Sequence, residues 1–341
     1  ESNKLESIPV TISNLASLRS LDLRGNHIAV LPAELGKLSD LRRLLIDKNE
    51  LTTLPACIGT LHNLTDLHAS ENYIASLPPE IGDLVSLLDL RLQYNDLQIL
   101  TREIIHLTSV TRLNVSFNKL RNLPEEIVGM VSLKILELDS NEVAALPIAI
   151  GALTDITELS LVGNKVTELP SEMGGLTALR ALRCDVEQFT SPPPEVFAQG
   201  VDTLIEYLGR VAEARSSNYL QLGDMGLQTL PSVVLNMEML EYLNLDGNNL
   251  KGLPANFTRL QSLTEISLAS NPIVALPPVI GTLSHLQSLH FDRTLLRSPP
   301  TEILDRGLPM IIEFLRRLYD AQDTGVMNLA GLALDNLVAG E

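Results

Sequence analysis

A spacing of 23 residues runs through the first half of the chain and constrains its fold more than any other feature. Asparagine recurs at this interval at Asn3, Asn26, Asn49, Asn72, Asn95, Asn118, Asn141 and Asn164. A Leu-Pro or Ile-Pro pair begins five residues after each asparagine, except at Leu100-Thr101. Repetition at a fixed interval predicts a stack of similar structural units rather than one compact core.

The chemistry of the unit explains why such units must stack. Each reads L-x-x-L-x-L-x-x-N-x-L-x-x-L-P-x-x-I-G-x-L-x-x. The L-x-L alternation predicts a short strand with inward leucines, and the proline ends it because its ring fixes φ. A buried asparagine at the turn can pair with backbone groups that would otherwise lack partners. We predict a structural asparagine ladder of Asn26, Asn49, Asn72, Asn95, Asn118, Asn141, Asn164, Asn248 and Asn271.

This repeat resembles that of the leucine-rich repeat family, and its LPxxIGxL ending resembles the 23-residue, Ras-group class of intracellular members. Leucine-rich repeat regions of Ras-binding scaffolds and of Roco GTPases are similar in this pattern. The resemblance implies an α/β solenoid of horseshoe shape, with a concave parallel sheet and an irregular or helical convex side. We expect one parallel sheet to run without a break through all the repeats. The alternative is a break between Glu187 and Met225, where the asparagine spacing lapses.

A second period, of 107 residues, relates two segments that depart from the first pattern. SPPPEVFAQGVDTLIEYLGRV begins at Ser191, and SPPTEILDRGLPMIIEFLRRL begins at Ser298. Apolar residues recur at helical spacing over 201–212 and 308–319, so each segment should carry a helix on the outer side of the solenoid. The predicted organisation is a first array over 1–190, a helical insert over 191–218, a second array over 219–297, a second insert over 298–325 and a truncated repeat over 326–341.

Charge and composition narrow the class of partner. The 341 residues include 25 Lys and Arg against 42 Asp and Glu, and this net charge of −17 argues against nucleic acid. No apolar stretch reaches the ~18 residues of a transmembrane helix, so we expect no membrane insertion. Two cysteines, Cys57 and Cys184, are too few for a disulfide framework and favour a reducing, cytoplasmic setting.

Sequence signatures of catalysis and metal binding are absent. The chain has no G-x-x-x-x-G-K-[ST], H-E-x-x-H, G-x-S-x-G or C-x-x-C motif. Its six histidines are scattered, and we expect His68 and His290 to stand alone on outward strand positions in solvent. The sequence therefore predicts a chain that is not an enzyme and that holds no metal or cofactor.

Outward side chains of the strands do not pack in the core, so they are the candidates for binding a partner. Tyr94 and Phe117 occupy equivalent positions in adjacent repeats, flanked by arginines, and tyrosine and arginine often anchor protein interfaces. The predicted partner-binding residues are His68, Arg91, Tyr94, Arg112, Phe117, Glu137 and Asp139. The alternative is that the two aromatic rings merely cover the edge of the sheet. Acidic outward residues prevail from Ile135 to Arg293, which favours either a basic partner or simple solubility.

These features together predict a non-enzymatic module that binds a protein on its concave face in intracellular signalling. The resemblance implies small GTPases, phosphatases or kinases as typical partner classes. Two alternatives are the regulatory region of a larger Roco-type GTPase or kinase, and a structural subunit of a large assembly. Both ends of the sequence fall inside repeats, so we expect it to be a piece of a longer protein.

Overall fold

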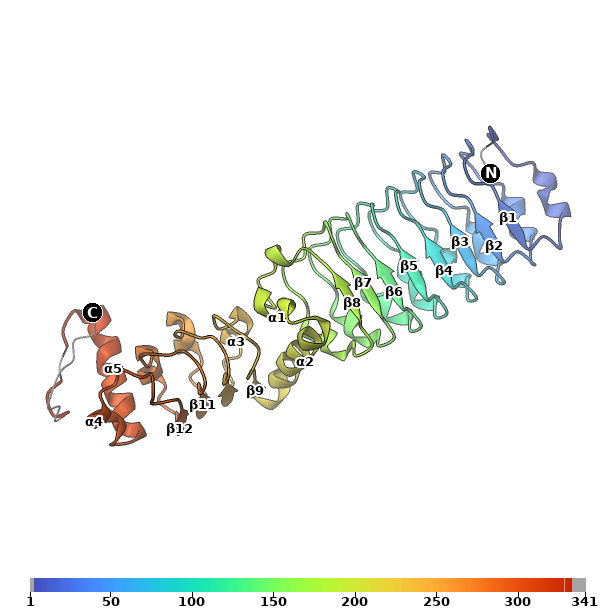
Figure 1. Ribbon diagram of the computed structural model, residues 1–341. Helices are drawn as coiled ribbons and strands as arrows, with labels where there is room; N and C mark the ends of the chain where they lie inside the picture. Colours follow the sequence, from blue (N-terminus) through green and yellow to red (C-terminus); the bar gives the residue numbers. More distant parts are fainter. Residues whose placement is uncertain (1–2, 328, 333–341) are drawn as a thin grey trace. The chain divides into compact units, whose positions relative to one another are not determined.

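A computed structural model describes residues 3–327 and 329–332, and it divides the chain into two compact units, Glu1–Phe189 and Thr190–Glu341. Each unit contains its own parallel sheet (Figure 1). Most of the truncated repeat that we predict over 326–341 lies outside the described residues, because residues 328 and 333–341 are not among them.

Eight short strands form the sheet of the first unit in the order of the sequence. Each pairs with the next in a parallel register of 23 residues, as in Leu21↔Leu44. From β2 to β7 the central residue of each strand is a leucine that is at most 1% exposed, which confirms the predicted solenoid of stacked units. The strands are β1 (Ser20–Asp22), β2 (Arg43–Leu45), β3 (Asp66–His68), β4 (Asp89–Arg91), β5 (Arg112–Asn114), β6 (Ile135–Glu137), β7 (Glu158–Ser160) and β8 (Ala181–Arg183).

Short 3-10 turns form the opposite, outer side of this unit. Most of them begin directly after the proline of the repeat, whose extended backbone ends the preceding segment, as Pro55 does at φ −72° before η3. The glycine of I-G-x-L lies where neighbouring turns meet, because a Cβ atom on Gly59 would lie 2.6 Å from the carbonyl oxygen of Glu80. The turns are η1 (Val10–Asn14), η2 (Ala33–Lys37), η3 (Ala56–Thr60), η4 (Pro79–Asp83), η5 (Arg102–His106), η6 (Glu125–Gly129), η7 (Ile148–Ala152), η8 (Ser171–Gly175) and η9 (Val186–Gln188).

Buried asparagine side chains link successive repeats beyond the ends of the strands. In Asn118, Oδ1 accepts from Leu97 N at 2.9 Å, and Nδ2 donates to Leu92 O and Val115 O, each at 3.0 Å. Asn26 accepts from Leu5 N and donates to Leu23 O. The full pattern of at least one accepted and at least two donated bonds recurs at Asn49, Asn72, Asn95, Asn141, Asn164, Asn248 and Asn271.

The second unit combines a smaller parallel sheet with α-helices. Its strands are β9 (Tyr219–Gln221), β10 (Tyr242–Asn244), β11 (Glu265–Ser267) and β12 (Ser288–His290), paired in sequence order. Its helices are α1 (Pro194–Ala198), α2 (Val201–Ser217), α3 (Ser232–Leu235), α4 (Thr301–Leu304) and α5 (Leu308–Thr324), with the turns η10 (Ala255–Arg259) and η11 (Pro278–Thr282). The helices α2 and α5 are each 17 residues long and start at positions related by the longer period.

The expectation of one uninterrupted sheet is wrong, because the described strands form two sheets, with β8 at an end of the first and β9 at an end of the second. The chain enters α1 and α2 after the first unit instead of returning to a strand at the 23-residue spacing. The helix α2 contacts β9, and Arg210 Nη1 donates to Gln221 O at 3.2 Å and to Gly223 O at 3.4 Å. In the first unit the equivalent carbonyls accept from the preceding repeat, as Ser70 O does from Lys48 N at 2.9 Å. A helix-borne arginine thus supplies the donors that another strand would provide.

The second helical insert repeats this arrangement. In α5, Arg317 Nη1 donates to Ala330 O at 2.8 Å, and these two residues lie 107 positions after Arg210 and Gly223. An i,i+4 ion pair positions each guanidinium, at 2.5 Å from Glu206 in α2 and at 2.8 Å from Glu313 in α5. The helix α5 also packs against the outer turn η11.

Within the ranges that the structure describes, no helix is both long enough and apolar enough to span a lipid bilayer.

Candidate protein-binding surface

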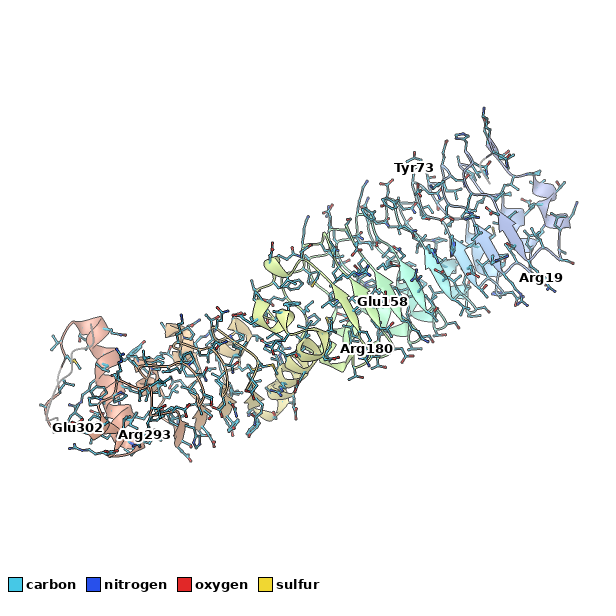
Figure 2. The ribbon with its side chains drawn as sticks, in the orientation of Figure 1. Arg19, Tyr73, Glu158, Arg180, Arg293 and Glu302 are labelled. Atoms are coloured by element: carbon cyan, nitrogen blue, oxygen red, sulfur yellow. The ribbon has the colours of Figure 1, made fainter. Side chains whose placement is uncertain are left out.

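Side chains that point away from the core along β1–β8 form what we call the sheet face, which is the predicted concave face of the first unit. Figure 2 shows Glu158 projecting from β7, Tyr73 at the rim where the strands end, and Arg19 and Arg180 at the rim where they begin. The predicted partner-binding residues all belong to the sheet face or to the first of these rims, over the repeats of β3–β6.

Tyr94 and Phe117 form a stacked pair at the rim where the strands end, which we call the rim pair. Their ring centroids are 4.2 Å apart with an interplanar angle of 9°, and the residues are 50% and 43% exposed. Both have a positive φ, 57° and 55°; the equivalent positions of other repeats hold either glycine, as at Gly25 and Gly163, or another residue with positive φ, as at Lys48, Glu71 and Ser140. A bulky side chain in this left-handed conformation costs about 1–2 kcal/mol, so the aromatic surface is kept against the preference of the backbone.

The two arginines beside the rim pair differ in how firmly they are held. Arg91 forms a fork with Asp89 of its own strand, with Nη2 at 2.7 Å from Oδ2 and Nε at 3.1 Å from Oδ1. Arg112 Nη1 lies 3.9 Å from Glu137 Oε2, which is a loose ion pair. The guanidinium of Arg112 is therefore the more available of the two for a partner's carboxylate.

Asp139 has a structural task that its sequence position did not reveal. Its Oδ1 atom accepts from Ser160 Oγ at 2.5 Å and from Val162 N at 2.9 Å in the next repeat. Asp246 makes the equivalent pair of contacts in the second unit, to Ser267 Oγ at 2.6 Å and Ala269 N at 2.7 Å. Part of the acidic character of the outward positions thus serves to join repeats.

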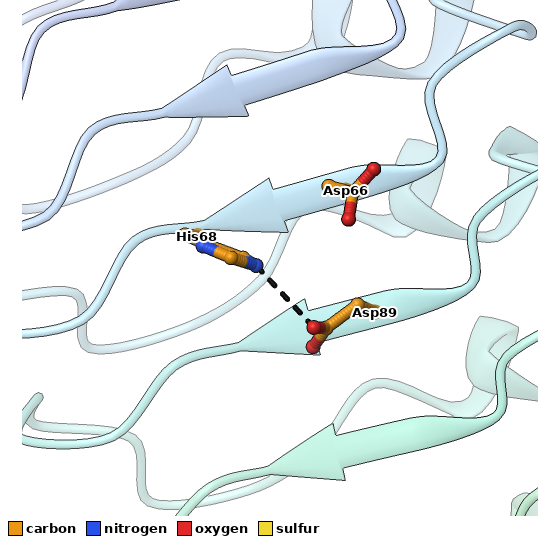
Figure 3. A group of neighbouring side chains, drawn as sticks. All are labelled: Asp66, His68 and Asp89. Carbon is orange, nitrogen blue, oxygen red and sulfur yellow. Dashed lines mark ion pairs between the residues drawn. The ribbon is translucent and has the colours of Figure 1, made fainter.

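His68 does not stand alone in solvent, and that expectation is wrong. The parallel register of β3 and β4 pairs Asp66 with Asp89, and the His68 side chain reaches toward Asp89 across the two strands (Figure 3). Nε2 of His68 lies 3.5 Å from Asp89 Oδ2, and both side chains are only 19% exposed. Burial opposes ionisation of Asp89, but hydrogen bonds from His68 and Arg91 outweigh it and lower the pKa of Asp89 to about 2. His290 also has neighbours, since its Nε2 lies 2.9 Å from Ser288 Oγ and 3.4 Å from Glu265 Oε1.

A polar hollow of about 360 Å³ opens in the sheet face over the repeats of β1–β4. Its lining comprises Arg24, Gly25, Asp47, Lys48, His68, Ser70, Glu71, Arg91 and Gln93. Two of the predicted binding residues, His68 and Arg91, thus line one depression, and Gln93 connects it to the rim pair along the chain. Arg112 and Glu137 follow on β5 and β6, so the predicted residues form a contiguous surface.

Two tyrosines on the second sheet form another aromatic stack, which sequence analysis did not single out. The rings of Tyr219 and Tyr242 have centroids 3.9 Å apart and an interplanar angle of 8°, and Tyr219 is 46% exposed. Burial, with a further contribution from Tyr219, raises the pKa of Tyr242. The two residues start consecutive strands at the 23-residue spacing, so comparing equivalent strand positions would have revealed them.

The chain matches known repeat proteins in sequence and in structure. The family model described as a leucine-rich repeat region matches residues 2–126 and 76–209, and one described as Leucine Rich Repeat matches 239–260. No curated protein matches the sequence.

Solved structures with similar folds come from different sources. A leucine-rich repeat protein of Leptospira interrogans is 27% identical with a TM-score of 0.52, and the match covers 91% of this chain and 93% of that one. An internalin, InlF, of Listeria monocytogenes is 20% identical with a TM-score of 0.50, over 87% of this chain and 83% of that one. A TDR receptor is 22% identical with a TM-score of 0.52, over 84% of this chain and 53% of that one.

Proposed function

Because the chain belongs to the leucine-rich repeat family, we propose that its first unit is a protein-interaction module whose partner binds the sheet face and the rim pair. The observation that carries this proposal is the exposed stack of Tyr94 and Phe117 at two left-handed positions. Aromatic anchors next to arginine and carboxylate groups are typical of the energetic centres of protein interfaces.

The charged neighbours define what the partner should present. Arg112 is only loosely paired, so it can form a two-point contact with a carboxylate of the partner. Arg91 is already engaged by Asp89, and we assign it the role of holding the surface in shape. A partner segment with an apolar or aromatic residue close to a carboxylate fits this arrangement.

The resemblance to the Ras-group class suggests where in the cell the protein acts. The 23-residue repeat resembles that of intracellular Ras-group proteins, and on that ground we propose a non-enzymatic scaffold in cytoplasmic signalling. A small GTPase, a phosphatase or a kinase is the proposed class of partner.

The test begins with capture of a partner from a lysate of the source cells, its identification by mass spectrometry and calorimetric titration of the purified pair. Tyr94→Ala or Phe117→Ala should weaken binding by at least about 1–2 kcal/mol, the usual size of an anchor effect. Tyr94→Gly should weaken it equally while relieving the left-handed backbone, so a loss of binding there is not a loss of folding. Tyr73→Ala is the matched control, since Tyr73 is a 58% exposed aromatic residue on the same rim but outside the rim pair.

A contrary result is equally specific. If the rim-pair variants bind like the parent while substitutions of exposed residues on α2 or α5 abolish binding, the sheet face is not the binding surface. The helices of the second unit would then carry the interaction.

A further inference from the structure

We infer that Asp66, His68 and Asp89 form a binding site for a divalent transition-metal ion, with Zn²⁺ as its probe. The three residues come from the facing strands β3 and β4 of the first unit (Figure 3). One ligand atom from each lies within 4.8 Å of the other two. This inference does not depend on the proposed partner, because metal binding is measured on the chain alone.

The separations approach those of a zinc site. Zinc ligands lie about 2.0–2.2 Å from the metal, so two ligands of a tetrahedral ion are about 3.3–3.6 Å apart. His68 Nε2 and Asp89 Oδ2 are already 3.5 Å apart, close to the edge of such a tetrahedron. The Asp66 carboxylate lies within 4.8 Å of the other two ligand atoms, so its side-chain torsions must change for it to reach the tetrahedral distance.

The donor set and its surroundings suit a metal of this class. One imidazole nitrogen with two carboxylate oxygens is a common ligand set of zinc and of other divalent first-row metals. Nε2 of His68 is buried, and its contact with Asp89 Oδ2 is long, at 3.5 Å, so the neutral imidazole can turn its lone pair to a metal without breaking a short hydrogen bond. Thr65 Oγ1 donates to Asp66 Oδ2 at 2.6 Å, which is the kind of outer contact that orients a metal-binding carboxylate.

Arg91 sets the strength of the site. Its guanidinium binds both oxygens of Asp89, and its positive charge repels a cation placed between Asp89 and His68. Removal of this charge should therefore increase the affinity of the triad for the metal. If the triad were only an ion-pair network, loss of Arg91 would not improve metal binding. Three protein ligands would leave one coordination position for water, and of the three only His68 also lines the polar hollow.

The experiment uses the whole chain without an affinity tag, stripped of metal and titrated calorimetrically with ZnCl₂. We expect one Zn²⁺ per chain, with binding weakened at least ~100-fold by His68→Ala and by Asp66→Asn, and tightened about tenfold by Arg91→Ala. His290→Ala is the matched control and should change nothing, since His290 ends β12 as His68 ends β3 and pairs with Glu265, but belongs to no cluster of three metal-ligating side chains among the residues that the structure describes. Titration with CoCl₂ should give the visible absorption bands of tetrahedral Co²⁺, and His68→Ala should lose them.

Equal zinc affinity in the parent and in His68→Ala would overturn the inference, as would weaker binding in Arg91→Ala. In either case His68 and Asp89 act as an ion pair alone. His68→Gln provides a second test with less loss of side-chain volume, and circular dichroism verifies that each variant is folded before titration.

Discussion

Replacement of Asn118 by alanine tests whether the asparagine side chains hold successive repeats together. The change removes one accepted bond and three donated bonds, to Leu92 O, Val115 O and Ser116 O. The three carbonyls keep other donors, because Asn95 Nδ2 reaches Leu92 O at 3.0 Å, Asn141 Nδ2 reaches Val115 O at 2.9 Å and Tyr94 N reaches Ser116 O at 3.0 Å. The backbone N–H of the fully buried Leu97 is the group that loses its partner.

The magnitude follows from this single orphaned donor. A buried polar group without a partner costs about 1–3 kcal/mol, so we expect Asn118→Ala to lower the free energy of unfolding by about 2 kcal/mol. Asn164→Ala should cost roughly 1–2 kcal/mol more. It orphans Val143 N, and it also removes the donor to Leu161 O, which no asparagine of the next repeat can replace because Glu187 stands in that position.

Urea unfolding followed by far-ultraviolet circular dichroism measures both effects. Asn63→Ala is the control, because the exposed Asn63 makes one bond, to Ser39 O at 2.9 Å, and its loss should matter by less than about 0.5 kcal/mol. If Asn118→Ala is no more destabilising than the control, or if Asn164→Ala costs less than Asn118→Ala, the reasoning is refuted.

Two further predictions concern packing and acid stability. Gly59→Ala should lower the melting temperature with a cost of about 1–3 kcal/mol, because its Cβ would meet Glu80 O at 2.6 Å, whereas Gly252→Ala, with nothing within 4 Å, should leave it unchanged or slightly raised. The folded pKa of Asp89, about 2, is below the ~3.9 of an unfolded chain, so its ionised form stabilises the protein above about pH 4 and this contribution is lost as the pH falls toward 2. Asp89→Asn should therefore be less stable than the parent at neutral pH, and acid titration of the unfolding free energy should show the gap closing in that window.

The regular part of the fold was predictable because the repeat length of the sequence equals the register between neighbouring strands of the sheet. The 23-residue spacing of asparagine and proline is also the register in which Leu44 pairs with Leu67, so a local pattern specified a tertiary contact. The helices of both inserts were predictable for a similar reason, since apolar residues at helical spacing need a surface to pack on.

The interruption of the sheet was not predictable in the same way. A longer step between repeats is compatible with an unbroken ladder, and only coordinates show that Arg210 takes over the carbonyls of Gln221 and Gly223. An arginine on an amphipathic helix carries no signal that its donors will be used by a strand edge.

The composition of the candidate site was visible in part. The rim pair could be predicted because Tyr94 and Phe117 occupy equivalent positions in adjacent repeats, and the structure shows that their rings stack. The convergence of Asp66, His68 and Asp89 arises from the register of two neighbouring strands, and a histidine standing alone in the sequence carries no sign of it. The sequence does not specify side-chain conformations. It therefore could not show that Arg112 is more loosely paired than Arg91, or that Asp139 joins two repeats.

The uniform register of the first unit also has a consequence for how it folds. Every strand pairs with residues 23 positions away, so adding a strand closes a loop of the same length each time and the entropic cost of closure does not grow along the array. Folding can begin at any pair of adjacent repeats and spread to both sides, one repeat after another. An eight-stranded parallel sheet, ordinarily a slow topology, is thereby assembled from short-range steps, and duplication of one repeat would lengthen it without making any single step harder.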